Sequence, residues 1–173
     1  MGAIRKHQPV KLFVGFIYKD DEVPARAQKV LSLRYGAVDV SSPVFPFHHT
    51  TYYEREFGIG LKRRFVAFER LVAAESLADV KLRANALERK YAAGPARAIN
   101  IDPGYLTLAK VVLATTKDFT HRLYIGKSIF AEVTLAYRDK GYKPWEWTYP
   151  DYSSKEYLDF FHQLRSRYAG QIK

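Results

Sequence analysis

Residues 97–122 read RAINIDPGYLTLAKVVLATTKDFTHR, and the predicted fold is organised around them. Apolar and polar side chains alternate over residues 98–102, which predicts a strand, and Pro103-Gly104 predicts a turn that closes it. Residues 106–115 are mostly apolar and could form a helix or a strand, because their periodicity does not distinguish the two. A dense polar segment ends the stretch. We expect these residues to form the floor and one wall of a ligand site.

Three strands and two helices are predicted before this stretch. The strands lie at residues 10–18, 37–47 and 62–71, and the helices at about residues 20–35 and 76–91. The first strand is apolar on both faces, which is typical of a central strand. Two prolines interrupt the second strand, which makes it an edge strand or an extended loop. With the strand at residues 98–102, the order is that of a ferredoxin-like sandwich, with helices on one face of an antiparallel sheet.

The C-terminal third adds a hairpin and a helix. Strands at residues 121–125 and 129–137 flank Gly126-Lys127, and a helix follows the capping box of Ser153 and Glu156. The chain contains no repeat, low-complexity tract or interdomain linker. We therefore predict one α+β domain over residues 1–173. Its sheet is mainly antiparallel, in ferredoxin-like βαββαβ order, extended by a C-terminal β-hairpin and a helix.

Composition indicates a folded domain with a basic surface. The chain has 173 residues, of which 47% are hydrophobic, a formal net charge of +10 and a pI near 9.7. This charge favours anionic partners such as phosphorylated small molecules, nucleotides and RNA. The absence of cysteine excludes disulfides and thiolate nucleophiles. No apolar run reaches the ~20 residues of a membrane span. We expect a cytoplasmic location and no membrane partner; the sequence specifies neither a cofactor nor an oligomeric state.

The candidate site joins the end of the strand at residues 98–102 to the polar segment. Asn100 and Asp102 share one face of that strand. Hydroxyls, cations and the imidazole of His121 follow between residues 115 and 122, and donors of these kinds converge on phosphates. His121 and Asp102 are the candidate catalytic residues, with His121 as general acid or base. The candidate ligand-binding residues are Asn100, Tyr105, Thr116, Lys117, Arg122, Arg64, Glu132, Tyr149 and Asp151.

Each of these features also has a structural explanation. Asp102 could cap the predicted turn, and the polar segment could be a solvated loop. No G-x-x-x-x-G-K-[ST] motif occurs, so the T-K-D triplet at residues 116–118 does not belong to a P-loop GTPase. An H-x-T motif occurs within residues 48–51, but two-histidine phosphoesterases need a second one, and His121 is followed by Arg and Leu.

Two other functions stay open at the sequence level. The chain could be a non-catalytic RNA- or protein-binding module that uses the basic triplet at residues 62–64 and exposed tyrosines. It could also be a metal-assisted phosphoester hydrolase that uses Asp102, Asp118 and Glu132 as ligands. Affinity for RNA that falls with salt would indicate the first function, and binding of magnesium or manganese the second.

Several long blocks resemble a known family. They are VKLFVGFI, SSPVFPF, TTYYEREFG followed by LKRRFVAFERL, NIDPGYLTLAKVVLATTKD, HRLYIG, FAEVTL and WTYPDY. Together they are similar to the prokaryotic domain-of-unknown-function family 4416 over nearly the whole chain. The resemblance implies a single-domain cytoplasmic protein and supplies no catalytic residues. Some relatives carry a GTP-binding label, which the missing P-loop does not support here.

Overall fold

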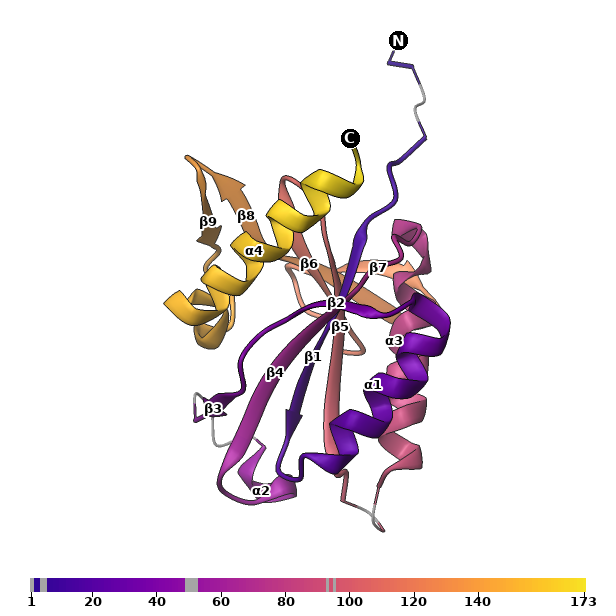
Figure 1. Ribbon diagram of the computed structural model, residues 1–173, viewed down its shortest axis with the longest axis vertical. Coiled ribbons are helices and arrows are strands. Elements are labelled where there is room, and N and C mark those ends of the chain that lie inside the picture. Colours follow the sequence, from indigo (N-terminus) through magenta and orange to yellow (C-terminus); the bar gives the residue numbers. More distant parts are fainter. Residues whose placement is uncertain (1, 4–5, 49–52, 93, 95) are drawn as a thin grey trace.

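Nine strands form one sheet within the residues that the computed structural model describes, which are all except 1, 4–5, 49–52, 93 and 95. The strands are β1 (Lys11–Tyr18), β2 (Val38–Ser41), β3 (Phe45–Phe47), β4 (Leu61–Phe68), β5 (Ile99–Leu106), β6 (Lys110–Thr115), β7 (Leu123–Gly126), β8 (Ile129–Arg138) and β9 (Gly141–Pro144). The helices are α1 (Glu22–Tyr35), the short α2 (Glu54–Phe57), α3 (Leu77–Lys90) and α4 (Lys155–Gln171) (Figure 1). Among these residues, no helix has the length and hydrophobicity to cross a membrane.

The first half of the sheet has ferredoxin-like connectivity. Its strands follow the order β2-β4-β1-β5, and β1 pairs antiparallel with both β4 and β5. Beyond β5 the order continues through β6, β8 and β7, while β3 pairs with β4 and β9 pairs with β8. The predicted α+β fold with βαββαβ order and a C-terminal extension is confirmed. The extension is larger than predicted, because β6 and β9 join the β7–β8 hairpin.

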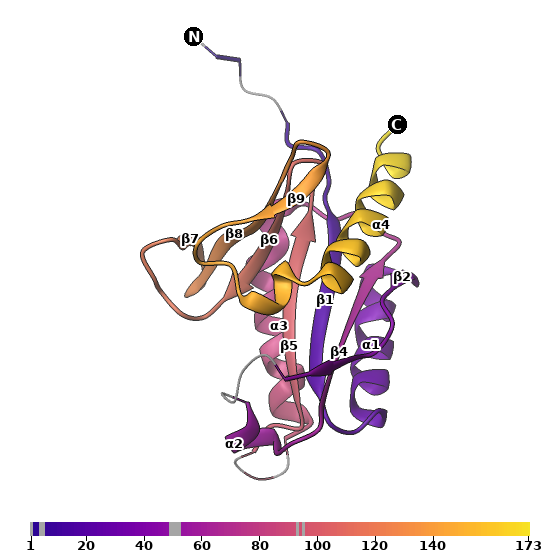
Figure 2. The same ribbon diagram turned by 90° about the vertical axis from the view of Figure 1, so that its left-hand side faces the viewer.

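Helices cover both faces of the sheet. α1 and α3 lie on one face, where Leu31 and Val80 pack with Leu12 of β1 (Figure 1). α4 lies on the other face, where Phe161 packs against Phe13 (Figure 2). Every residue of β1 is buried, as predicted for a central strand. We expected helices on one face of the sheet, and this holds for α1 and α3. The other face of β1 is also apolar and is buried by α4.

Two segments differ from their predicted boundaries. The strand predicted at residues 37–47 is two short strands, β2 and β3, which both pair with β4. The turn predicted at Pro103-Gly104 is wrong, because β5 continues through both residues in register with β1. Proline has no backbone N–H to donate to a neighbouring strand. At Pro103 none is needed, because β6 pairs with β5 only from Gly104 onward. The undecided residues 106–115 contain the strand β6.

Gly104 lies at a close approach between β5 and β6. A Cβ atom there would be 2.5 Å from the carbonyl oxygen of Val112 and 2.6 Å from Cζ of Phe13. Because the Val112 oxygen belongs to the paired backbone of β6, Gly104→Ala is expected to lower the free energy of unfolding by about 1–3 kcal/mol. Urea denaturation measures this change. Gly170→Ala, which places its Cβ in open space on α4, is the control and should not destabilise the protein.

A buried ion pair connects β1 to β2. Lys11 Nζ donates to Asp39 Oδ2 at 2.7 Å, and Arg167 Nε of α4 donates to the same oxygen at 2.8 Å. Burial lowers the pKa of Lys11, against the opposing effect of its hydrogen bond to Asp39. The folded chain therefore binds fewer protons than the unfolded chain as the pH approaches the usual lysine pKa. The contribution of Lys11 to stability rises with pH and is lost as the pH falls through its folded-state pKa.

Asp39→Asn is expected to lower the free energy of unfolding by about 1–2 kcal/mol at pH 7, because it weakens a charge-assisted bond to the buried ammonium of Lys11. The deficit relative to the native sequence should shrink toward pH 10, where Lys11 can lose its proton. Urea denaturation of both proteins across this pH range tests the expectation. A deficit of constant size at every pH would contradict it.

Candidate functional site

The sheet opens between β5 and β6, and the candidate site lies in this opening. The two strands pair only at residues 104–106 of β5, and β6, β8 and β7 then turn away from it (Figure 2). Side chains of α3 satisfy the backbone that lacks a strand neighbour. Glu88 Oε1 accepts the N–H of Ile101 at 2.6 Å, and Lys81 Nζ donates to the Ile101 carbonyl at 3.0 Å. The space between the diverging strands is therefore bounded by α3.

This space is a cavity of about 700 Å³, which is within the size range of small-molecule sites. Its wall combines apolar side chains, such as Ile17 and Leu113, with many charged ones. The cations that line it are Arg63, Lys81, Arg89, Arg97, Lys117 and Arg122. The carboxylates that line it are Glu88, Asp102, Glu132 and Asp151.

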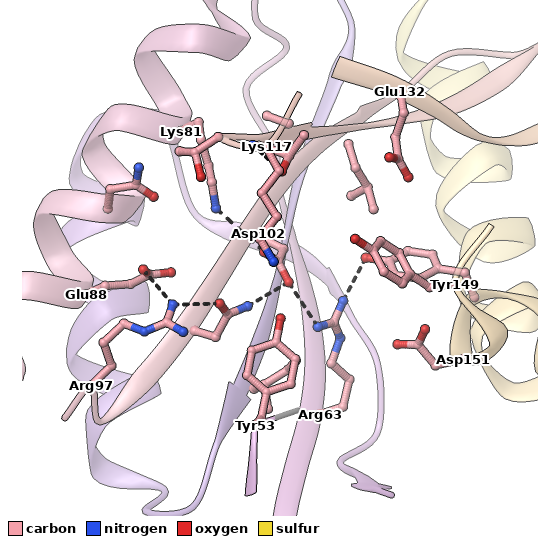
Figure 3. Close-up of a pocket in the computed structure, with 18 of the residues that line it drawn as sticks. Tyr53, Arg63, Lys81, Glu88, Arg97, Asp102, Lys117, Glu132, Tyr149 and Asp151 are labelled. Atoms are coloured by element: carbon pink, nitrogen blue, oxygen red, sulfur yellow. Dashed lines mark hydrogen bonds and ion pairs between the residues drawn. The ribbon is translucent and has the colours of Figure 1, made fainter. Parts of the chain in front are cut away.

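Asp102 lies at the centre of this wall. Its Oδ2 accepts hydrogen bonds from Asn100 Nδ2 at 2.7 Å and from Arg63 Nη1 at 3.3 Å. Its Oδ1 is 3.6 Å from Lys81 Nζ. Lys117 extends into the cavity toward the same carboxylate from the loop after β6 (Figure 3). One carboxylate therefore lies among three cationic side chains, and these cations come from β4, α3 and the loop after β6.

Arg63 is the most deeply buried of the cations, with 1% of its surface exposed. Its Nη2 donates to the Tyr152 hydroxyl at 2.7 Å, and its guanidinium carbon lies 4.6 Å from the ring centre of Phe65. Gly15 makes room for it, because a Cβ atom at this position would be 2.7 Å from Arg63 Nη2. Among the described residues, Arg63 Nε has no hydrogen-bond partner.

Arg64, which we named from the sequence, is not part of this wall. Side chains of β4 alternate, so Arg63 shares the face of Phe65, whereas Arg64 shares the face of Val66 on the side of α1 and α3. The member of the basic triplet that lines the cavity is Arg63. Apolar residues follow both arginines at alternate positions, so the sequence of the strand does not show which arginine lies on the α4 face.

Arg97 closes one end of the cavity and was not predicted. Two of its nitrogens donate to the two carboxylate oxygens of Glu56, each at 2.7 Å. Its Nη1 also donates to Glu88 Oε2 at 3.2 Å and to Asn100 Oδ1 at 3.0 Å (Figure 3). Burial raises the pKa of Glu88, and Lys81 opposes this effect.

A second charged group forms the opposite wall. Arg122 Nε donates to Glu132 Oε2 at 2.7 Å, and Arg122 Nη2 donates to the Tyr149 hydroxyl at 3.1 Å. His121 Nε2 lies 3.2 Å from the same oxygen of Glu132. Both Arg122 and Glu132 are buried, so their charges compensate each other away from solvent. Glu132 thus connects Arg122, which lines the cavity, to His121, which lies outside it.

The structure brings together most of the residues predicted from the sequence. Those that line the cavity are Asn100, Asp102, Thr116, Lys117, Arg122, Glu132, Tyr149 and Asp151. Tyr105 does not, because it packs with the apolar cluster around Val112, where burial raises the pKa of its hydroxyl. His121 lines a separate shallow hollow with Trp147.

Lys81 and Glu88 were also missed by the sequence analysis. They are seven residues apart on α3, with Asn85 between them, and this spacing places all three on one face of the helix. The helical spacing alone predicts that these three side chains share one face of α3. The sequence does not show that this face lies opposite the strand at residues 98–102.

No group of three or more metal-binding side chains is present among the described residues. The set of Asp102, Asp118 and Glu132 therefore does not form a ready metal site in this part of the chain. The H-x-T motif within residues 48–51 includes residues 49–51, which lie outside the described residues.

The fold and the cavity define a ferredoxin-like α+β domain with a charged ligand-sized cavity beside its fourth core strand, β5. The chain belongs to the family described as Domain of unknown function (DUF4416), whose sequence model matches residues 8–168. The matched segment includes every residue of the cavity wall named above. No curated protein and no solved structure matches this chain.

Proposed function

We propose that the cavity binds a phosphorylated small molecule or a nucleotide. The observation that carries this proposal is the group of cations around Asp102. Lys81, Arg63 and Lys117 converge on one carboxylate, so the centre of the cavity has an excess of positive charge. A phosphate brings two negative charges and several acceptor oxygens to such a group, and it would be bound by charge-assisted hydrogen bonds.

The two sides of the cavity suit different parts of such a ligand. Lys81 and Lys117 approach from the α3 and β6 side, and they can donate to phosphate oxygens. Asn85 of α3 lines the same cavity and carries an amide that can both donate and accept. Ile17, Phe47 and Tyr53 provide an apolar and aromatic surface for the body of the ligand.

The proposal assigns binding to this cavity and does not assign a reaction. His121 reaches the cavity only through Glu132, so it is not placed to touch a ligand there. Asp102 is the candidate catalytic residue that faces the cavity. If the bound ligand reacts, we expect the Asp102 carboxylate to accept a proton from it.

The basic triplet at residues 62–64 gives little support to the alternative RNA-binding proposal. Lys62 pairs with Asp21, and Arg63 is buried in the cavity wall. Arg64 points to the opposite face of β4 from Arg63. The three cations therefore do not share one exposed surface on which a phosphate backbone could lie.

A thermal-shift screen of paired compounds tests the proposal. Each nucleotide or sugar phosphate is compared with its dephosphorylated counterpart at the same concentration. Binding to the folded state raises the melting temperature, and we expect a rise only for phosphorylated members of some pairs. A screen in which no phosphorylated compound raises the melting temperature, at concentrations up to several millimolar, would contradict the proposal.

A further inference from the structure

Four aromatic rings form a continuous stack on the surface outside the cavity. Phe119 and His121 of the loop before β7 lie parallel, with ring centres 6.1 Å apart. His121 stacks on Trp147 at 5.3 Å, and Trp147 stacks on Trp145 at 5.2 Å, all within 10° of parallel. We call these four rings the aromatic ladder. It joins two loops that are more than twenty residues apart in the sequence.

The aromatic ladder is open to solvent. Phe119 is 54% exposed, Trp145 37% and Trp147 36%. In the part of the chain that the structure describes, all large aromatic side chains classed as exposed lie between residues 119 and 149. Three of these five are in the ladder. Exposed aromatic side chains are thus concentrated in one region of the chain, which favours a binding role over random placement.

Arginine side chains stack at both ends of the aromatic ladder. At the inner end the guanidinium carbon of Arg122, which is buried, lies 4.6 Å from the ring centre of Phe119. At the outer end that of Arg138, which is exposed, lies 5.0 Å from the ring centre of Trp145. A planar guanidinium occupies the position on Trp145 that a planar base would take, and because Arg138 is exposed, it can move aside.

Positive charge accompanies the outer end of the ladder. Lys143 pairs with Ala136 across the β8–β9 hairpin, so the two side chains lie on the same face of the sheet. Arg138 follows Ala136 by two residues in β8 and therefore lies on this face too. Tyr142 points to the opposite face, into the core beneath α4. Lys143 is exposed. Glu146 lines the hollow beside His121 and Trp147. Arg138 and Lys143 can therefore contact phosphates on either side of a stacked base.

We propose that the aromatic ladder binds single-stranded nucleic acid, with an unpaired base stacked on Trp145 and with Arg138 and Lys143 on the adjacent phosphates. Aromatic rings beside exposed cations are the two components of sequence-tolerant binding to single strands. This site is separate from the cavity and does not depend on the function proposed for it. The chain's net charge of +10 favours the same partner.

The experiment uses the full chain and a fluorescein-labelled oligouridylate of about eight nucleotides, which is within the usual site size for single strands. The chain has two tryptophans, and both are in the ladder, so tryptophan fluorescence reports on this site alone. We expect saturable quenching of tryptophan fluorescence and a rise in anisotropy with the single strand, and neither with a blunt duplex of the same length.

Variants separate stacking from charge. Trp145→Ala should weaken binding roughly tenfold, and Trp145→Phe should restore most of the affinity because it keeps a ring. Arg138→Gln and Lys143→Gln should each reduce the slope of log affinity against log salt by about 0.7. Tyr124→Ala, an exposed ring outside the ladder, and Lys29→Gln, on α1, are the matched controls and should bind like the native chain.

Three results would overturn the proposal. The first is the absence of saturable binding at low salt. The second is native affinity in Trp145→Ala. The third is loss of binding in a folded cavity variant, Lys81→Met, because this would place the nucleic acid in the cavity.

Discussion

Replacing Lys81 with methionine is expected to weaken binding of a phosphorylated ligand by about 1.5–3 kcal/mol, roughly 10- to 150-fold. Lys81 is a buried cation on the cavity wall, 3.6 Å from the central carboxylate of Asp102. Methionine has a similar length and no charge, so the variant removes the ammonium and keeps most of the packing. Isothermal titration with the best compound from the thermal-shift screen measures the loss.

The same substitution also has a cost in stability. The Ile101 carbonyl loses its hydrogen bond from Lys81 Nζ, and an unsatisfied buried carbonyl costs about 1–3 kcal/mol. Titrations are therefore made well below the melting temperature of the variant. Lys117→Gln, at an exposed position on the cavity rim, is the second variant and should reduce affinity in the same direction. Lys90→Met, an exposed position on α3 outside the cavity, is the control.

Two outcomes would contradict this expectation. If Lys81→Met and Lys117→Gln both bind with native affinity, the phosphate is not held by the cations of the cavity. If Lys90→Met loses as much affinity as Lys81→Met, the effect comes from the overall charge of the protein and not from this site.

Glu132→Gln is expected to lower the free energy of unfolding by about 3–5 kcal/mol. Arg122 and Glu132 are both buried, and the substitution leaves the guanidinium without its countercharge. The same carboxylate oxygen lies 3.2 Å from His121 Nε2, so the position of His121 in the aromatic ladder should also be disturbed. Urea denaturation measures the first effect, and tryptophan fluorescence of the folded protein reports on the second.

A double substitution separates charge burial from packing. Glu132→Gln combined with Arg122→Met should be less destabilised than the sum of the two single variants, because it leaves no unpaired buried charge. Asp159→Asn, which breaks an exposed ion pair with Lys155 on α4, should leave stability unchanged. Additive effects of Glu132→Gln and Arg122→Met would contradict the assigned role of the pair.

The fold could be predicted largely because its periodic elements are well marked. The apolar residues of β1 and the helical spacing of α3 placed the ferredoxin-like core correctly. Pro103-Gly104 was misread as a turn because local turn propensity does not reveal where a neighbouring strand begins. In the fold, the glycine is needed for the close approach of β6 and the proline lies just outside its ladder. Tertiary context overrides the local signal here.

The candidate site was predicted in part, for a similar reason. Asn100, Asp102 and Lys117 were found because strand alternation and polar clustering are local signals. Arg63 and Lys81 were missed since each reaches the cavity from an element distant in sequence. Arg97 was missed although it lies only three residues before Asn100. The divergence of β5 from β6 creates the cavity, and no pattern within either strand specifies that divergence.

The central claim is that the cavity around Asp102 holds a phosphate. The most direct measurement is isothermal titration of the native chain with the best phosphorylated compound and with its dephosphorylated counterpart, each repeated with Lys81→Met. We predict that only the phosphorylated compound binds the native chain, and that Lys81→Met reduces this affinity at least tenfold. Equal affinity for both compounds, or equal affinity of both proteins for the phosphorylated one, would contradict the claim.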